Sequence, residues 1–216
     1  MLSIPEEILL LTLDDEKGTP VDVPAIQIDC AIAGAILMDL ALRCRIDTGL
    51  DELFTVSTEP TGDPLLDEVL ECIVADQEQH DAAYWVQVLS HRSGEYRDRI
   101  AERLVEAKIL KRVEERLLWF FGSRRYPQID GGEEREVKRR IVNVLLDDGL
   151  PDPRDIVILT LADTCGVLDR ILSTRELKNV EGRLRQLERM DLIGQAVTRT
   201  VYDIRSSIPP LVAPIM

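Results

Sequence analysis

The segment SIPEEILLLTLDDEKG, residues Ser3–Gly18, shows how this chain begins to fold. Ser3 and Glu6 have the spacing of a capping box, in which the serine oxygen accepts from a helix-start amide while the glutamate accepts from the serine amide. The apolar run Ile8–Leu13 that follows fits a helix or an early strand. The polar residues before Gly18 are typical of a turn. We therefore expect a short capped helix at the start of the chain, followed by a turn.

Apolar residues recur at helical spacing in several later segments. In Asp29–Arg45 they recur every four positions, which predicts a long helix, whereas Ser90–Glu95 is expected to be a polar loop. Further helices are predicted after the cap Asp63-Pro64, around Tyr84–Val88, over the basic segment Tyr96–Leu110, around Val137–Leu145, from Asp152 through Leu172, after the capping box Ser173–Glu176, and through Val201 and Ile204.

One segment has a different character. Arg116–Tyr126 reads RLLWFFGSRRY, two β-rich arms around Gly122-Ser123, and predicts a β-hairpin. The chain has no internal repeat and no linker long enough to separate domains. We therefore predict a mainly α fold, a single compact helical domain over residues 1–216 with a hydrophobic β-hairpin at about 112–129.

The composition supports helices and a soluble protein. Hydrophobic residues make up 45% of the chain and aromatic residues only 4%, so Leu, Ile, Val and Ala have to build the core. No apolar run approaches the roughly 18 residues that span a bilayer. Pro5-Glu6-Glu7 stands where a signal peptide would carry Lys or Arg. These features predict a cytoplasmic protein, peripheral to any membrane that it binds.

The sequence offers little material for catalysis or for a metal site. It contains no G-x-S-x-G, P-loop or Gly-rich dinucleotide motif. It has 2 histidines, and its 4 cysteines form no C-x-x-C pair. We therefore expect no metal, no cofactor and no enzymatic activity. The alternative that the sequence leaves open is a pair of catalytic carboxylates far apart in the chain.

Charge is distributed unevenly along the chain, whose net charge is −14. Residues 1–80 contain 3 Lys or Arg against 18 Asp or Glu, whereas residues 92–140 contain 14 against 10. Because salt screens each charge within roughly 8 Å, a local basic surface can attract phosphate although the whole molecule is acidic. Candidate phosphate-binding side chains before the hairpin are Arg92, Arg97, Arg99 and Arg103. The alternative is that these charges pair with interleaved acids or only solvate helix faces.

The predicted hairpin carries Trp119, Phe120 and Phe121 in succession, followed by Arg124 and Arg125. Neighbouring strand residues point to opposite faces, so at least one ring points away from the face that buries the others. An apolar tip beside two guanidinium groups fits a bilayer interface, where each cation contributes about 1 kcal/mol. The same tip also fits an interface with a second subunit, or packing against its own helices. No nucleic acid partner is expected, because the basic residues are not segregated from the acids.

Six segments, in this order, resemble the Golgi phosphoprotein 3 family, in a prokaryotic-type form. They are PEEILLLTL (5–13), LALRCRI (40–46), TGDPLLDEVL (61–70), RDRIAERLVEAKIL (97–110), LADTCGVLD (161–169) and RLRQL (183–187). The resemblance implies a compact helical domain with a protruding hydrophobic hairpin used for membrane contact and self-association. It also implies binding of phosphatidylinositol 4-phosphate and of glycosyltransferase tails, as in eukaryotic members.

The eukaryotic lipid pocket has a Trp, an Arg within the helix rich in small residues, and two Arg one helical turn apart. By resemblance, the Trp position falls near Val23–Pro24 and the helix Arg at Ala33. The last pair falls at Gly94 and Arg97, so Arg97 alone matches. Arg92 is the candidate to replace the missing cation.

We therefore predict a non-enzymatic peripheral membrane protein that binds anionic phospholipid headgroups through Arg97 and Arg92. The lipid is similar to phosphatidylinositol 4-phosphate by the resemblance, and we expect a positively charged hollow around Arg97. The hairpin residues are expected to contact the membrane or a second copy of the chain, and a protein client is also expected. The alternative prediction is a cytosolic protein-interaction adaptor that binds no lipid and offers its acidic first 80 residues to a partner.

Overall fold

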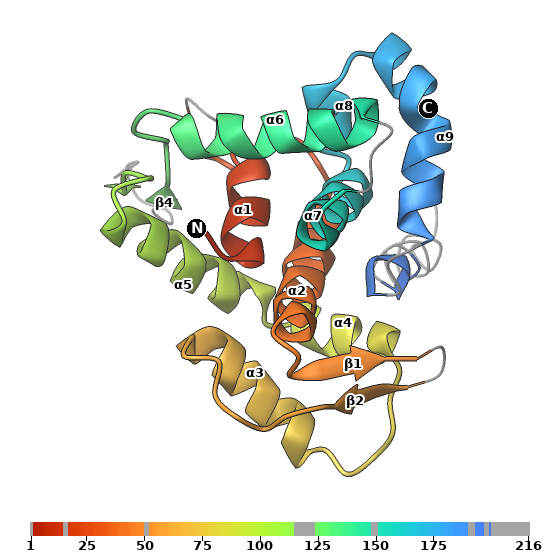
Figure 1. The fold of residues 1–216 in the computed structure, drawn as a ribbon. Helices are drawn as coiled ribbons and strands as arrows, with labels where there is room; N and C mark the ends of the chain where they lie inside the picture. The colour runs from red at the N-terminus through yellow and green to blue at the C-terminus, as the bar shows by residue number, and fades with distance from the viewer. Residues whose placement is uncertain are drawn as a thin grey trace, which may run out of the picture.

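In a computed structural model, the described residues are 2–14, 17–49, 52–114, 124–147, 151–189, 193–196 and 199. They form a mainly helical fold, which confirms the predicted fold class (Figure 1). The elements are, in chain order, α1 (Ile4–Leu11), α2 (Ala25–Leu42), β1 (Ile46–Thr48), β2 (Leu53–Thr55), α3 (Pro64–Ala75), α4 (Ala82–Ser90), α5 (Ser93–Glu106), β3 (Val113–Glu114), β4 (Arg124–Arg125), α6 (Gly132–Leu146), α7 (Pro153–Thr164), α8 (Leu168–Ile171) and α9 (Thr174–Glu188).

Helix α1 is enclosed by four other helices. Its predicted capping box is confirmed: Ser3 Oγ accepts from the Glu6 amide at 3.4 Å, and Glu6 Oε2 accepts from the Ser3 amide at 2.7 Å. All of its residues are buried, and it contacts α2, α5, α6 and α7 (Figure 1). The apolar run that fitted a helix or a strand is therefore helical through Leu11, because its whole circumference packs against other helices.

Helix α2 is the core helix, and it begins four residues before the predicted start. By length and composition it could cross a membrane, with a mean hydropathy of 1.8 over 18 residues, so the expectation that no run reaches this length was wrong. Of its residues, 72% are buried within the fold, and it contacts α1, α3, α4, α5 and α7. Asp29 and Asp39 interrupt its apolar sequence, but each finds a cationic partner, Arg97 and Arg43 respectively.

Helix α5 corrects two predicted boundaries. It begins at Ser93, where a polar loop was predicted, and ends at Glu106, where it was predicted to continue to Leu110. Ser93 is fully buried and its hydroxyl donates to the Asp29 carbonyl at 2.8 Å, which holds the helix start against α2. Lys108 has a φ of 60°, a left-handed conformation that ends the helix.

Two short antiparallel sheets accompany the helices. The pair β1 and β2, in which Ile46 lies opposite Thr55, was not predicted, because three-residue strands leave little alternation to detect. The predicted hairpin is confirmed at its base, where Val113 pairs with Arg125 and Glu114 with Arg124. Its aromatic residues Trp119, Phe120 and Phe121 lie outside the described residues.

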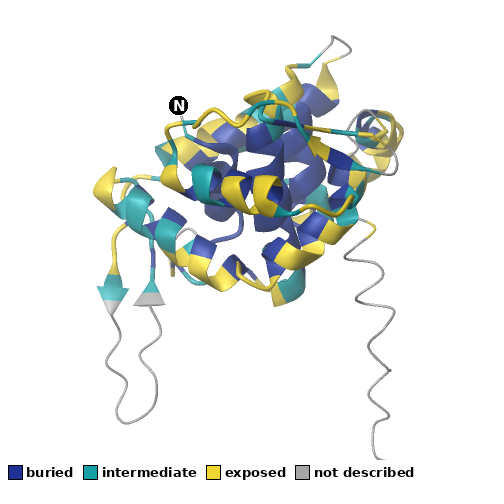
Figure 2. Ribbon diagram, turned by 90° about the horizontal axis from the view of Figure 1, so that it is seen from below, coloured by how far each residue is buried: buried dark blue, intermediate teal, exposed yellow. Residues whose placement is uncertain are grey.

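The C-terminal helices follow their predicted caps. Asp152 accepts from the Arg154 amide at 2.8 Å, and the capping box of Ser173 and Glu176 is present. The segment predicted as one helix through Leu172 is instead α7 and α8, because Gly166 adopts a φ of 71° between them. The helix predicted through Val201 and Ile204 lies outside the described residues. Buried residues line the inward faces of the helices, and exposed residues cover the outside (Figure 2).

A carboxyl pair between α7 and α9 makes stability depend on pH. Burial, and next the nearby hydrogen-bonded Glu188, raise the pKa of Asp163 from 3.8 to about 7. The folded state therefore keeps a proton that the unfolded state releases, so stability is lost as the pH rises from about 4 to 7. We expect Asp163→Asn to be more stable than the wild type by about 2 kcal/mol at pH 8 and equal to it below pH 4, in urea unfolding. An equal difference at both pH values would contradict this.

Candidate functional site

A cavity of about 610 Å³ lies beside Arg97, between the end of α1, the first half of α5 and the base of the hairpin. Its described lining is Leu9, Thr12, Leu13, Gly18, Pro20, Ile28, Gly94, Arg97, Asp98, Ala101 and Tyr126. The volume lies within the range of small-molecule sites. Aliphatic side chains form much of the wall, and one cation and one carboxylate stand among the described lining residues.

Arg97 is held from the α2 side. Its Nη2 lies 3.3 Å from Asp29 Oδ1, and its side chain is 28% exposed. Burial raises the pKa of Asp29, and the charge of Arg97 opposes that rise. A strong charge-assisted hydrogen bond spans about 2.7–2.9 Å, so this ion pair is a loose one. A cavity therefore lies beside Arg97, but two carboxylates stand against its one described cation: Asp29 pairs with Arg97, and Asp98 lies in the lining. A positive charge of the hollow as a whole stays a prediction.

The neighbouring arginines are engaged elsewhere. Arg92 does not line the cavity; its Nη2 lies 2.7 Å from Glu68 Oε1 and 3.0 Å from Glu95 Oε2. These hydrogen bonds raise the pKa of Arg92. Arg99 Nη1 shares Glu68 at 2.6 Å. Two of the candidate cations are thus tied to a carboxylate of α3, in the TGDPLLDEVL segment.

The structure brings two of the four pocket positions given by the resemblance to the cavity. Gly94 and Arg97 lie one turn apart on α5, and both line the cavity. Ala33 is fully buried in α2, and Pro24 forms the cap position before that helix. The structure therefore brings the two α5 positions to the cavity wall but leaves no cation at the α2 position.

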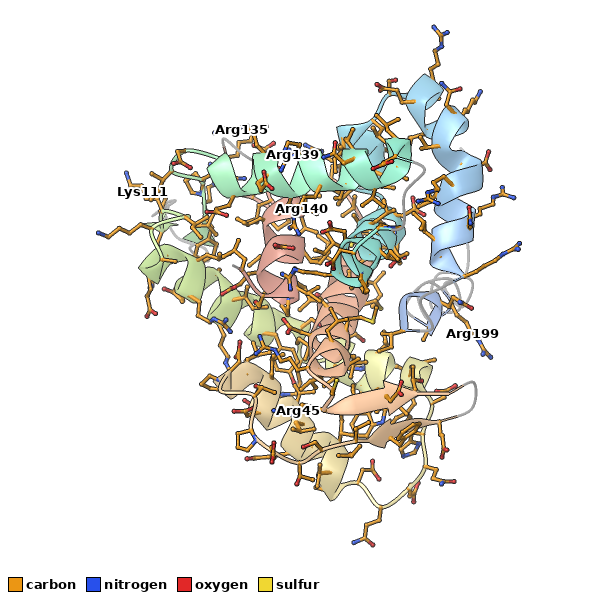
Figure 3. The ribbon with its side chains drawn as sticks, in the orientation of Figure 1. Arg45, Lys111, Arg135, Arg139, Arg140 and Arg199 are labelled. Atoms are coloured by element: carbon orange, nitrogen blue, oxygen red, sulfur yellow. The ribbon has the colours of Figure 1, made fainter. Side chains whose placement is uncertain are left out.

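The basic residues around the hairpin serve mainly as ion-pair partners. On α6, Arg139 Nη2 lies 2.7 Å from Glu136 on the exposed side, and Lys138 pairs with buried Glu134. Arg140 lies on the side of α6 that faces α1 (Figure 3). The backbones of Arg124 and Arg125 form β4. This agrees with the alternative in which interleaved acids neutralise basic residues.

The sequence reasoning did not predict a network of buried charges around α1. Glu7 is 3% exposed; its carboxylate lies 2.7 Å from Arg140 Nη2 and 3.3 Å from Arg154 Nη2. Glu6 lies 3.0 Å from Arg103 Nη2. The signal was present, since two acids interrupt an otherwise apolar helix, and buried charges require partners.

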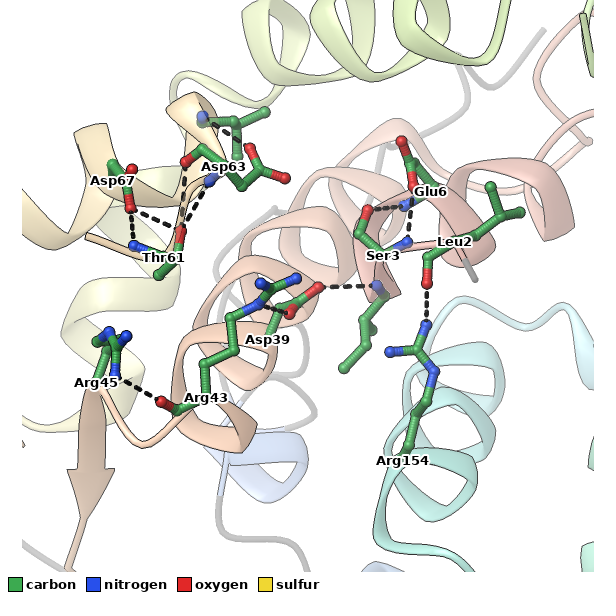
Figure 4. A network of polar contacts seen from close by, with 12 residues as sticks. Leu2, Ser3, Glu6, Asp39, Arg43, Arg45, Thr61, Asp63, Asp67 and Arg154 are labelled. Atoms are coloured by element: carbon green, nitrogen blue, oxygen red, sulfur yellow. Dashed lines mark hydrogen bonds and ion pairs between the residues drawn. The ribbon is translucent and has the colours of Figure 1, made fainter. Parts of the chain in front are cut away.

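The start of α1 is also fixed by backbone contacts (Figure 4). Asp39 Oδ2 accepts from the Ile4 amide at 3.0 Å, and Arg154 donates to the Leu2 carbonyl at 2.6 Å. In the same view Asp63 caps α3, and Thr61 donates to Asp67 at 2.6 Å. The PEE and TGDP motifs thus have structural roles as caps and charge partners. Among the described residues, no group of three or more His, Cys, Asp or Glu side chains is placed to hold a metal ion.

Comparisons with known proteins find related sequences. The sequence model of the family described as Golgi phosphoprotein 3 (GPP34) matches residues 4–204. The chain is also similar to "Vacuolar protein sorting-associated protein 74" of Eremothecium gossypii, with 28% identity over 208 residues. That alignment covers 80% of this chain and 62% of the relative, so the chain spans less than two thirds of that protein's length.

Proposed function

The chain belongs to the Golgi phosphoprotein 3 family, and we therefore propose that it is a non-enzymatic peripheral membrane protein of the cytoplasm. It binds an anionic phospholipid headgroup, of the phosphatidylinositol 4-phosphate class, in the cavity beside Arg97. The observation that carries the proposal is a partly exposed guanidinium in the wall of a cavity large enough for a headgroup.

The loose ion pair supports an exchange of partners. Arg97 lies 3.3 Å from Asp29, and a phosphate that accepts two parallel hydrogen bonds from a guanidinium competes well with this single, long contact. Arg92 acts from outside the cavity by drawing anions toward this face of the protein. Its bonds to Glu68 and Glu95 limit that role.

The position of the cavity also supports membrane contact. Tyr126 lines the cavity and directly follows β4, so the cavity lies against the base of the hairpin. A hairpin that inserts Trp119 and Phe120 into the interface, with Arg124 and Arg125 on lipid phosphates, would bring headgroups close to Arg97. The same aromatic residues, with Phe121, are the proposed surface for self-association.

We expect Arg97→Ala to weaken binding to phosphatidylcholine vesicles that contain phosphatidylinositol 4-phosphate by about tenfold, because one charged hydrogen-bonding partner is lost. Asp29→Asn keeps the side-chain shape but removes the competing charge, and is expected to tighten binding. Vesicle sedimentation at two salt concentrations measures both effects.

The matched control is Arg139→Ala, which removes an exposed arginine that is also paired with a glutamate. It is expected to bind like the wild type. If binding does not change with Arg97→Ala, with the anionic lipid content or with salt, the electrostatic part of the proposal is wrong.

A second candidate function is a protein-interaction adaptor that binds no lipid. It is favoured by two apolar side chains on or beside the β1 and β2 pair, Phe54 at 44% and Val56 at 54% exposure. These side chains belong to the acidic first part of the chain, which would supply the client surface. Capture of a client that Phe54→Ser abolishes, together with no vesicle binding, would favour this function.

A further inference from the structure

A second cavity, of about 560 Å³, adjoins the segment that follows α1. Its described lining is Leu11, Leu13, Asp14, Lys17, Glu134, Lys138, Val167, Arg170 and Ile171. Leu13 lines both this cavity and the one beside Arg97, so the chain at this residue is a shared wall. The Gly18 amide donates to the Asp14 carbonyl at 2.8 Å, which closes the turn after this wall.

Three separate elements bring a cation to this cavity. Lys17 comes from the turn, Lys138 from α6 and Arg170 from α8. Lys138 pairs with Glu134, a carboxylate that is only 2% exposed and also accepts from Gln128. One of the three charges is therefore matched by a buried partner.

The side chains of the other two cations have no carboxylate within hydrogen-bond distance among the described residues. Arg170 Nη2 lies 4.0 Å from Asp14 Oδ2, beyond hydrogen-bond distance, and its side chain is 47% exposed. Lys17 is exposed, and within the described part of the chain its side chain makes no ion pair. A guanidinium and an ammonium thus line the cavity with donors that described carboxylates do not occupy.

We propose that this cavity binds a phosphate-class anion, a phosphomonoester or a pyrophosphate, between Lys17 and Arg170. A terminal phosphate group carries three oxygens that point in different directions, so it can accept from Lys17 and from Arg170 at the same time. The aliphatic wall of Leu11, Val167 and Ile171 accommodates an organic group attached to the phosphate. The inference is independent of the lipid site at Arg97, because the cations are different residues in a different cavity.

The test is calorimetric titration of inorganic pyrophosphate into the full chain. Lys17→Gln combined with Arg170→Gln is expected to weaken binding by at least about tenfold, since two charged partners are lost. Arg97→Ala is expected to stay within about twofold of the wild type, which separates this site from the lipid proposal. Lys178→Gln with Arg185→Gln, two exposed cations of α9, is the charge-matched control.

One variant is expected to gain affinity. Asp14→Asn keeps the side-chain oxygen that accepts from the Lys17 amide at 2.9 Å, but removes a negative charge from the cavity wall. Tighter pyrophosphate binding follows if an anion occupies the site, whereas a purely structural role predicts no gain. This readout does not depend on the stability of the double variant.

A second arm identifies the source of the phosphate. Vesicles of phosphatidylcholine with phosphatidic acid are compared with soluble pyrophosphate for the wild type and the double variant. Loss of both interactions in the double variant assigns a lipid phosphate, and loss of the soluble one alone assigns a free ester. Absence of pyrophosphate binding at millimolar concentration, or binding that the double variant leaves unchanged, would overturn the proposal.

Discussion

Glu7→Ala is expected to destabilise the protein by about 3–5 kcal/mol, because it removes a buried carboxylate that two partly buried arginines share. Glu7 is 3% exposed, and its two oxygens contact Arg140 and Arg154 at 2.7 Å and 3.3 Å. Arg140 retains Asp155 at 2.7 Å, which places the expected cost toward the lower end of this range. Urea unfolding followed by circular dichroism measures it.

The control for this substitution is Glu136→Ala, which breaks an ion pair of the same kind on the exposed side of α6. Exposed pairs contribute little to stability, because water and salt screen the two charges. A double-mutant cycle of Glu7→Ala with Arg140→Ala should show a coupling energy of about 1–3 kcal/mol. If the Glu7 and Glu136 variants lose equal stability, the buried network does not hold α1 as described.

The helix caps show why much of this fold was predictable from the sequence. Helix starts at Ser3, Asp63, Asp152 and Ser173 depend on short-range hydrogen bonds, so a few neighbouring residues specify them. The β1 and β2 pair was missed because its short strands depend on tertiary partners, including the Leu53 amide that donates to the His80 carbonyl at 2.8 Å. Hydrogen bonds between neighbouring residues predict where helices begin. Strands too short to show an alternation of apolar and polar residues form only through tertiary packing.

The candidate site was less predictable for the same reason. The resemblance gave Gly94 and Arg97 as the last two pocket positions, and the structure places both at one cavity. The sequence did not indicate that Glu68, 24 positions before Arg92, would bind that arginine. Nor did it single out Lys17 and Arg170, whose positions in the chain are far apart and which line one cavity only after folding. Long-range charge pairing carries no periodicity that a sequence pattern can reveal.

Gly18→Ala is expected to cost about 3 kcal/mol and to disturb the cavity beside Arg97, because conformational strain and a steric clash add together. Gly18 has a φ of +63°, which alone costs an alanine about 1–2 kcal/mol. An added Cβ would also fall well within 3.0 Å of the backbone nitrogen of Pro127 and the carbonyl carbon of Tyr126. These are backbone atoms, which cannot rotate away as a side chain can, so the turn and the hairpin base have to separate.

Gly62→Ala separates these two costs. Gly62 has a φ of +82°, but nothing lies within 4 Å of the position that a Cβ would take there, so its alanine variant is expected to lose only the conformational part. The Gly18 carbonyl accepts from the Tyr126 amide at 2.9 Å, and both residues line the cavity beside Arg97. Gly18→Ala should therefore also weaken vesicle binding, whereas Gly62→Ala should not. Equal unfolding free energies for the two alanine variants would mean that the turn after α1 does not press against the hairpin base.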